Sequence, residues 1–308
     1  MQISPEEKSV SKLISITSSR TANRVSIWSK YFSLTKPKVV LLLLITGLTG
    51  FLLTNDQGLP AIILFCYTGY ASAGGAMAIN SYIDRDVDRL MERTLKRASV
   101  GNNAIKPRNI LVFGSILVGS AILLAFVIFN LNTAFFVCWG VLFYIIGYSL
   151  YLKRKTVLNT VLGGFSSAAP VWVGFAAGLG HVPVEGWLLG LLVFIWNPAH
   201  TWTLAAKYLQ DYKEARIPMF PVVYGLKHTS EVNFILGIIL IMYSSVLALW
   251  LSTEYLLVVL ILLVPHLLLI IMNIKFLRNP TEKIAYKTFK VLNIWLAIVF
   301  ITIVLLSV

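Results

Sequence analysis

The chain has 308 residues, of which 57% are hydrophobic and only 13% are charged. A soluble globular domain carries about a quarter charged residues, so the composition excludes an ordinary soluble enzyme and indicates an integral membrane protein. The formal net charge is +13, but lysine and arginine follow the predicted topology, and we expect no nucleic-acid partner. The two cysteines, Cys66 and Cys138, each lie in an apolar run, which indicates neither a disulfide framework nor a Cys/His metal site.

The first 30 residues are rich in serine and basic residues and lack the apolar core of a signal peptide. We expect a flexible cytoplasmic tail, or a segment lying on the surface, over residues 1–30. Its arginine and serine content would also suit a transit peptide, against which Glu6 and Glu7 argue. The rest, residues 31–308, is predicted to be a single transmembrane domain.

Nine apolar stretches follow, each close to the roughly 20 residues that a helix needs to cross a bilayer. They predict an all-α, polytopic membrane protein with nine transmembrane helices. The stretches cover about residues 38–54, 60–83, 109–130, 133–152, 157–179, 187–208, 230–252, 255–276 and 288–307. Residues 55–58, 130–132 and 252–254 are predicted to be tight links between antiparallel neighbours.

Basic residues set the orientation of these spans, because cytoplasmic loops carry an excess of lysine and arginine. All 26 lysine and arginine residues lie in the tail through Lys38, or in and directly beside the loops after spans two, four, six and eight. The intervening loops on the opposite side have none. This alternation predicts a multi-pass protein of the cell membrane with a cytoplasmic N-terminus and a C-terminus outside.

Acidic residues are few, and they are densest at the cytoplasmic end of the second span, in Asn80-Ser-Tyr-Ile-Asp84-Arg-Asp86-Val-Asp88-Arg-Leu-Met-Glu92-Arg93. If the helix continues, Asn80, Asp84, Asp88 and Glu92 share one face at i, i+4 spacing, whereas Asp86 points elsewhere. Like charges at this spacing repel, so we expect a compensating cation. Mg²⁺ takes carboxylate and amide oxygens and keeps positions for phosphate oxygens.

Arg85, Arg89, Arg93 and Arg97 would form a second i, i+4 ridge beside the acidic one. Guanidinium groups bind phosphate oxygens well, and the combination predicts a metal–diphosphate site. A plainer alternative is a charged helix end with local ion pairs. The small residues 71–76 before the cluster let helices approach closely under either interpretation.

A second polar cluster follows the sixth span, and the charge pattern puts its Asp211 on the same side as Asp84. It could hold a second metal bridged by diphosphate, or form a simple i, i+4 ion pair with Lys207. His200 lies inside the span, where an imidazole is costly and often functional. It could contact an acceptor, ligate iron, act as a base, or be hydrogen-bonded within the bundle.

Several of these stretches, in this order, resemble the UbiA-type prenyltransferases in the form found in heme O synthases. The resemblance covers about residues 30–230 and includes the acidic run, Met91-Glu-Arg93-Thr94, Leu34-Thr-Lys-Pro-Lys38, Tyr151-Leu-Lys-Arg154-Lys-Thr156, Asn159-Thr160, Gly163-Gly164, Ala168-Ala169-Pro170, Asp211-Tyr212 and Ile217-Pro-Met-Phe-Pro-Val-Val-Tyr-Gly225. The nine predicted spans also equal the helix count of that family.

The resemblance implies that a farnesyl group passes from farnesyl diphosphate to a vinyl group of heme B, giving heme O in heme A biosynthesis. Heme would be a substrate rather than a cofactor, and a downstream heme A synthase a partner. Mg²⁺ would be the cofactor, held by Asn80, Asp84, Asp88 and Asp211. The catalytic residues would be Asp84, Asp88 and His200, and the substrate would be bound by Arg93, Arg97, Lys153, Arg154, Asn159, Lys207 and Tyr212.

Three positions depart from the family pattern; the metal residues are intact, but two of the changes fall near the presumed acceptor side. Ala98 stands where the family usually has Pro, Arg216 where Gly is usual, and Trp196-Asn-Pro-Ala-His200-Thr201 where Trp-Thr-Pro-Pro-His-Phe is usual. A sibling prenyltransferase acting on a quinone precursor, a pigment or a glycerol phosphate is therefore the nearer alternative. A secondary transporter is the alternative from a different class, but we find no internal repeat of the kind transporters often show.

Overall fold

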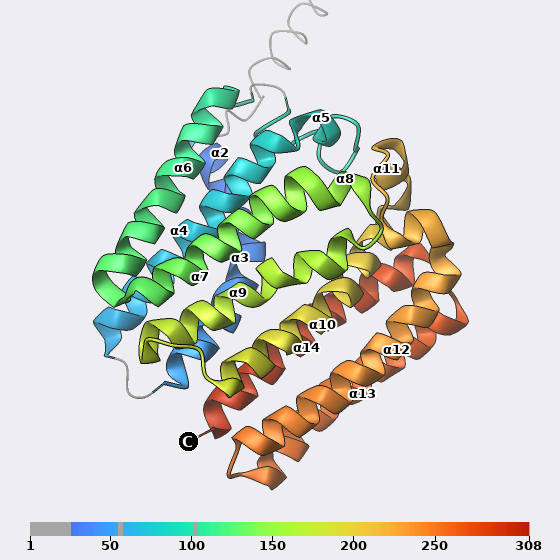
Figure 1. Cartoon of the computed structure of the whole chain (residues 1–308). Helices are drawn as coiled ribbons and strands as arrows, with labels where there is room; N and C mark the ends of the chain where they lie inside the picture. The colour runs from blue at the N-terminus through green and yellow to red at the C-terminus, as the bar shows by residue number, and fades with distance from the viewer. Residues whose placement is uncertain (1–25, 55–57, 102–103, 308) are drawn as a thin grey trace, which may run out of the picture.

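The computed structural model describes residues 26–54, 58–101 and 104–307, and within these ranges the chain is helical and has no β-strand (Figure 1). This confirms the predicted fold class. The helices are α2 (Ile27–Leu34), α3 (Pro37–Leu52), α4 (Leu59–Ile83), α5 (Arg85–Asp88), α6 (Pro107–Leu124), η1 (Ala125–Phe129), α7 (Leu131–Leu142), η2 (Phe143–Leu152), α8 (Lys153–Lys155), α9 (Asn159–Leu179), α10 (Val184–Lys207), α11 (Leu209–Glu214), α12 (Phe220–Leu251), α13 (Tyr255–Arg278) and α14 (Glu282–Leu306). Both η segments are π-helical.

Eight helices of the described chain are long and apolar enough to cross a membrane, and the bent pair α2–α3 makes a ninth if it is one span. Most of their ends fall within a few residues of the predicted stretches. The exception is α12, which begins at Phe220 instead of residue 230 because a short helical turn precedes Gly225, a non-helical residue with φ of 78°.

The first span is bent by 47° between α2 and α3. Lys36 adopts a left-handed conformation at the break (φ 49°), and Pro37 occupies the first turn of α3, where its missing N–H leaves no helical bond unmade. Because α2 begins at Ile27, the last residues of the expected tail are helical; the rest of that tail, residues 1–25, lies outside the described residues.

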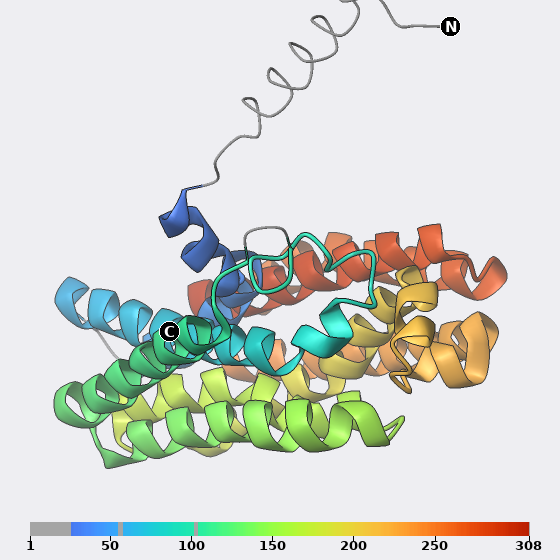
Figure 2. The same cartoon turned by 90° about the horizontal axis from the view of Figure 1, so that it is seen from above.

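Neighbouring spans pack on one another around the bundle, from α4, α6, α7 and α9 through α10, α12 and α13 to α14. The ring closes because α14 packs on α3, which also packs on α4 and α9 (Figures 1 and 2). The helices α5, α8 and α11 therefore gather at one end of the bundle, together with the start of α3 (Figure 1). This is the end to which the charge pattern assigns the basic loops.

Glycines allow α3 and α9 to cross closely. A methyl group at Gly174 of α9 would overlap the Gly47 carbonyl oxygen of α3, and one at Gly50 would meet the Val171 carbonyl oxygen. Small residues at crossing points let helix backbones approach and pack in a membrane, where apolar side chains have no preference for protein over lipid.

The outer surface is apolar, as a lipid-facing surface must be. Large side chains of α6 and α13 are strongly exposed, among them Ile116 (64%), Leu256 (71%) and Val264 (68%). Polar side chains instead turn inward: Asn233 and Asn273 are buried between α12 and α13 and hydrogen-bond each other at 2.6 Å. Apolar exposure on this scale does not occur on soluble monomers.

Candidate functional site

The acidic motif sits where a long helix stops. α4 ends at Ile83 and the single turn α5 ends at Asp88, yet the Asp84 N–H donates to the Asn80 carbonyl and the Asp88 N–H to the Asp84 carbonyl (2.9 and 2.7 Å). Asn80, Asp84 and Asp88 therefore keep their predicted turn-by-turn spacing, and all three are buried, at 4%, 2% and 3% exposure.

The chain leaves the helix after Asp88, so the predicted continuation through Glu92 is wrong, and so is the arginine ridge. Arg85 instead lies over the Tyr82 ring at 5.3 Å, and Arg97 returns to Asp88. The segment after Asp88 instead meets α11, where the Glu92 and Arg93 N–H groups donate to Asp211.

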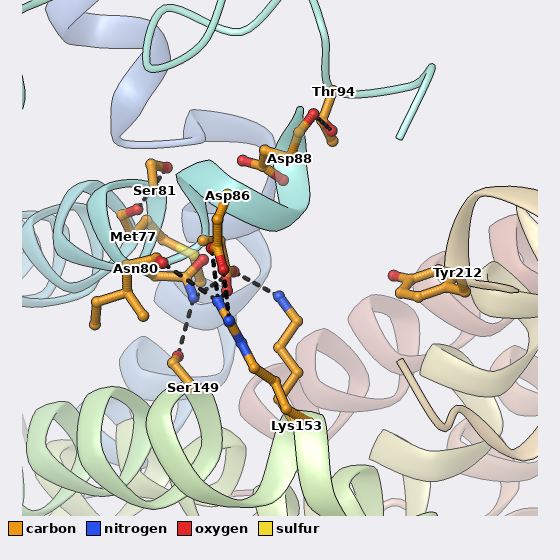
Figure 3. Close-up of polar contacts among 12 residues, drawn as sticks. Met77, Asn80, Ser81, Asp86, Asp88, Thr94, Ser149, Lys153 and Tyr212 are labelled. Atoms are coloured by element: carbon orange, nitrogen blue, oxygen red, sulfur yellow. Dashed lines mark hydrogen bonds and ion pairs between the residues drawn. The ribbon is translucent and has the colours of Figure 1, made fainter. Parts of the chain in front are cut away.

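A basic and polar shell surrounds the Asp84 carboxylate, and Figure 3 labels Asn80, Ser149 and Lys153 of this shell. The Asn80 amide donates to the Asp84 carboxylate and to the Ser149 hydroxyl, each at 2.9 Å. The Lys153 ammonium donates to Asp84 at 2.5 Å, and the Lys36 ammonium donates to the side-chain Oδ1 of Asn80 at 3.0 Å. Five side chains from α3, α4 and the η2–α8 helix thus form one connected network.

The π-helix η2 positions two members of this network. In a π-helix residues five apart succeed one another, and the Ser149 hydroxyl accordingly donates to the Tyr144 carbonyl at 2.9 Å. Ser149 accepts the Asn80 hydrogen bond, and Lys153, which follows the end of η2, donates to Asp84. π-Helical segments inside α-helices are frequent at functional sites.

The second carboxylate has its own partner. Arg97 donates to both oxygens of Asp88 at 2.8 Å, and the Thr94 hydroxyl donates to the Asp88 carbonyl at 2.6 Å. Figure 3 shows Asp88 and Thr94 beyond the end of α4. The Arg97 side chain is 30% exposed, so it links a buried acid to the water-facing side.

Arg154, predicted to bind substrate, donates two hydrogen bonds to the Asp86 carboxylate, at 2.7 and 2.8 Å, in a bidentate pair. That side-chain hydrogen bond lowers the pKa of the Asp86 carboxyl below its ordinary value. Asp86 is 64% exposed, in agreement with the prediction that it points away from the acidic face. An Arg154 nitrogen lies 3.9 Å from Asp84, so the guanidinium group stands at the edge of the buried network.

Asp211 lies at the same end of the bundle, as predicted, but its oxygens bind backbone. They accept the N–H groups of Glu92 and Arg93 at 3.2 and 3.1 Å. The Arg93 guanidinium then lies over the Tyr208 ring at 4.8 Å and donates to the Tyr212 hydroxyl at 3.4 Å. In Figure 3 Tyr212 stands across from the Asn80 group.

A small apolar core joins the segment after α4 to the segment after α10. Val87 and Met91, next to the acidic motif, pack with Tyr212, Ile217 and Met219. The loop after α4 and the segment after α10 therefore form one packed layer over this end of the bundle. Asp211 adds hydrogen bonds between the two segments.

The remaining predicted site residues lie in two other places. Asn159 begins α9 and donates to the carbonyls of Thr156 and Pro218, so it braces the connection between α8 and α9. Lys207 lies 3.8 Å from Glu282 of α14. The expected Lys207–Asp211 ion pair is absent from the described residues.

His200 lies deeper in the bundle. Its ring stacks on Trp196, with 4.1 Å between the ring centroids, and packs at a tilt against Phe289, with 4.7 Å between the centroids.

A cavity of about 310 Å³ is lined by Lys36, Arg93, Lys96 and Arg97 together with Ser81 and Ser99. It adjoins the acidic motif through Lys36, which contacts Asn80, and Arg97, which contacts Asp88. Lys36 and Lys96 were not among the predicted site residues. For Lys36 the available signal was a Lys-Pro pair at the start of the first span, where Pro37 fixes the bend that turns the lysine inward. A cavity with four cationic side chains fits an anionic ligand such as a diphosphate.

The buried acids also fit a divalent cation. Asp84 and Asp88 with the Asn80 amide offer hard oxygen donors on successive turns, and one Asp84 oxygen is buried without a hydrogen-bond partner. Among the described residues no cluster combines three or more histidine, cysteine or acidic side chains around a common point. Mg²⁺ needs no such cage, because it commonly binds one or two carboxylates together with substrate phosphates.

Comparison with known proteins decides the family. The UbiA prenyltransferase family matches residues 43–298. The chain belongs to the UbiA prenyltransferase family. As a UbiA member with many apolar helices it is a multi-pass membrane protein, which confirms the resemblance seen in the sequence.

Curated relatives of this UbiA protein carry one activity in their names. It is 35% identical to protoheme IX farnesyltransferase 1 of Cenarchaeum symbiosum over 88% of this chain and 93% of the relative. It is 37% identical to the protoheme IX farnesyltransferase of Sulfolobus acidocaldarius over 89% and 95%. A Pseudomonas fluorescens relative of the same name is 42% identical over 68% of this chain and 70% of its own.

Solved structures share the fold. A digeranylgeranylglyceryl phosphate synthase superimposes with a TM-score of 0.69 at 19% identity, covering 91% of this chain and 98% of the other. A UbiA homologue from Archaeoglobus fulgidus, bound to DMAPP and Mg²⁺, gives 0.66 at 17% identity, covering 89% and 99%.

Proposed function

We propose that this UbiA protein is a protoheme IX farnesyltransferase, which transfers the farnesyl group of farnesyl diphosphate to a vinyl group of heme B and produces heme O and diphosphate. The observation that carries the proposal is the buried pair Asp84 and Asp88, each held by a cationic side chain at the end of a membrane bundle. The names of relatives 35–42% identical to this chain support heme as the acceptor.

Asn80, Asp84 and Asp88 are the residues we assign to Mg²⁺. The Mg²⁺ in the Archaeoglobus fulgidus homologue supports the choice of ion. When bound, the ion supplies positive charge to the departing diphosphate oxygens. Asp211, the fourth ligand expected from the resemblance, is engaged with backbone amides, and we assign it to holding the Arg93 loop instead.

Cationic side chains bind the leaving diphosphate. Lys153 and Arg97 now neutralise Asp84 and Asp88, and a cation on those acids would release both side chains toward diphosphate oxygens. Lys36 and Arg93 face the adjoining cavity. Fixed positive charge of this kind stabilises the negative charge that develops as the C–O bond of the prenyl diphosphate breaks.

The reaction has two steps, prenyl transfer to the vinyl group and addition of water. The allylic C–O bond breaks with both electrons leaving on diphosphate, and the vinyl π electrons of heme form the new C–C bond. Water then adds to the resulting cation beside the porphyrin and loses a proton, which leaves a hydroxyethylfarnesyl group. The packed layer of loops and the apolar bundle keep other water from the allylic cation.

We also propose where the enzyme lies, how it is oriented and where its product goes. Residues 31–308 form the catalytic unit in the cell membrane, with the α5–α11 end cytoplasmic and the C-terminus outside. Heme is a substrate, and the lipophilic product passes to a heme A synthase.

The test is a reaction of the detergent-purified chain with heme B, Mg²⁺ and farnesyl diphosphate, read by mass spectrometry. We expect a heme heavier by one farnesyl group plus one hydroxyl group, lost in Asp84→Asn and retained in Glu254→Gln, an exposed carboxylate outside the site. Diphosphate release with unmodified heme would identify a sibling prenyltransferase with another acceptor. Neither product from a folded protein would contradict prenyl transfer and favour transport.

A further inference from the structure

The short helix α2 is amphipathic, and part of its apolar side is bare. Successive residues of an α-helix are about 100° apart, which sorts the apolar and polar residues of α2 onto opposite sides. The apolar side carries Ile27, Trp28, Tyr31, Phe32 and Leu34, and the polar side carries Ser29, Lys30 and Ser33. Trp28 is 80% exposed and Phe32 is 58% exposed, so these two aromatic rings have little protein around them.

The other edge of the apolar side docks on the bundle. Leu34 is buried and packs with Ile105 and Ile110, and the Tyr31 ring lies 4.9 Å from the Phe113 ring of α6. Ile105 belongs to the loop before α6, and Ile110 and Phe113 lie in its first two turns. The helix α2 therefore lies at the end of the bundle that carries the aspartates.

The bare side of α2 continues into the lipid-facing side of α4. The Phe32 ring stacks on the Tyr70 ring, with 6.5 Å between centroids and 15° between planes. Tyr67 and Ile63, on the same side of α4 as Tyr70, are 50% and 58% exposed. Figure 2 shows α2 leaving the side of the bundle, away from the other helices. One apolar surface thus runs from a membrane span onto α2, which favours lipid as its cover.

The length and direction of α2 fit a helix that lies in the membrane surface. Its eight residues span only about 12 Å, and it is bent by 47° from α3. Short amphipathic helices with aromatic side chains bind at the boundary between headgroups and acyl chains, where tryptophan is enriched. We propose that α2 lies in the headgroup region of the leaflet at the aspartate end, with Trp28 and Phe32 inserted among the lipids.

This placement matters for the site because the last part of α2 forms a wall of the basic cavity. Ser33, Leu34 and Lys36 line that cavity, and Lys36 also donates to Asn80 at 3.0 Å. The left-handed Lys36 and Pro37 join α2 to α3 at the bend. Lipid around Trp28 and Phe32 therefore holds this wall in place, and the bilayer completes the binding site for diphosphate, a consequence that rests on the proposed function.

The experiment measures the depth of a nitroxide label on the full chain in nanodiscs of phosphatidylcholine and phosphatidylglycerol. The label is attached to Trp28→Cys in a chain that carries Cys66→Ser and Cys138→Ser. Exposed Glu214→Cys and Ile116→Cys provide the references for water and for acyl chains. Power saturation compares collisions with oxygen, which concentrates in lipid, and with a water-soluble nickel chelate. The Trp28→Cys label should resemble the acyl-chain reference toward oxygen and meet nickel less often than the water reference.

A matched probe on the same helix is Ser29→Cys, which lies on the polar side and should meet nickel more often than Trp28→Cys. Phe32→Cys reports the same side as Trp28→Cys if that variant does not fold. A Trp28→Cys label as open to nickel as the water reference would overturn the proposal. Protection from both oxygen and nickel would also overturn it, because a second copy of the chain or another protein would then cover this side.

Farnesylation kinetics in the same nanodiscs test the cavity wall. Trp28→Ser combined with Phe32→Ser should raise the KM for farnesyl diphosphate about 10-fold and leave kcat nearly unchanged, because the wall contributes to binding. Leu256→Ser combined with Leu260→Ser, which removes exposed apolar side chains of α13, is the control and should change neither. An unchanged KM in the α2 variant would overturn the role of lipid in holding the wall. A wild type that forms no product would contradict the proposed function, whereas the depth of α2 is measured independently of activity.

Discussion

Replacing Asp211 by asparagine tests whether this acid holds a loop or a metal ion. In the structure its two oxygens accept the N–H groups of Glu92 and Arg93. An asparagine keeps one acceptor oxygen but turns an NH₂ group toward the second N–H. The loop should therefore open more often, and Arg93 should leave its place between Tyr208 and Tyr212.

The size of the effect follows from the contacts. A hydrogen bond to a charged group contributes about 1.5–3 kcal/mol. The Glu92 N–H lies at an exposed position and the Arg93 N–H is only partly buried, so we take the loss as one such bond rather than two. At roughly 1.4 kcal/mol per factor of ten, the loop should open about 10- to 100-fold more often.

The assay is amide hydrogen exchange of the detergent-purified chain, which reports local opening directly. In Asp211→Asn the amides of Glu92 and Arg93 should exchange faster by the factor above, whereas Glu214→Gln, on the same short helix, should leave them unchanged. The Mg²⁺ concentration needed for half-maximal activity should stay near the wild-type value. A large rise in that concentration with unchanged exchange would refute the reasoning and return Asp211 to the metal.

Three further substitutions test other parts of the site and fold. Lys36→Met removes a cation from the basic cavity and should raise the KM for prenyl diphosphate about 10- to 100-fold in steady-state kinetics, with little change in thermal unfolding. Asp88→Leu leaves Arg97 without its carboxylate and should lower the Tm. Because that guanidinium is 30% exposed, the free energy of unfolding should fall by about 1–3 kcal/mol, less than the roughly 3–5 kcal/mol expected for a fully buried pair. Gly174→Val would drive a side chain into the α3 backbone and should abolish folded yield on size-exclusion chromatography, whereas Gly119→Val, with nothing within 4 Å, should not.

The sequence was sufficient for the spans because apolar length is a local property. Each predicted stretch became a helix, and the i, i+4 spacing of Asn80, Asp84 and Asp88 survived the helix end because the backbone bonds of that turn persist. Glu92 was misplaced since nothing in its own neighbours signals that α4 must stop. That end is imposed by packing against the segment after α10.

Tertiary partners account for the other differences. Lys36 reaches Asn80 only because a left-handed residue and Pro37 bend the first span. The sequence put Asp211 at the right end of the bundle but could not reveal that backbone amides of a distant loop would occupy its oxygens.

The π-helix η2 gives its span a spare residue. A π-turn holds an extra residue compared with an α-turn, so deleting one residue between Phe143 and Leu152 would let the segment relax into the commoner α-helix. The tighter turn would absorb the deletion, and the helix on either side would keep its orientation, with Lys153 still facing Asp84. The same deletion from a regular α-helix would rotate everything after it by about 100°. This span should therefore tolerate the loss of one residue better than its α-helical neighbours.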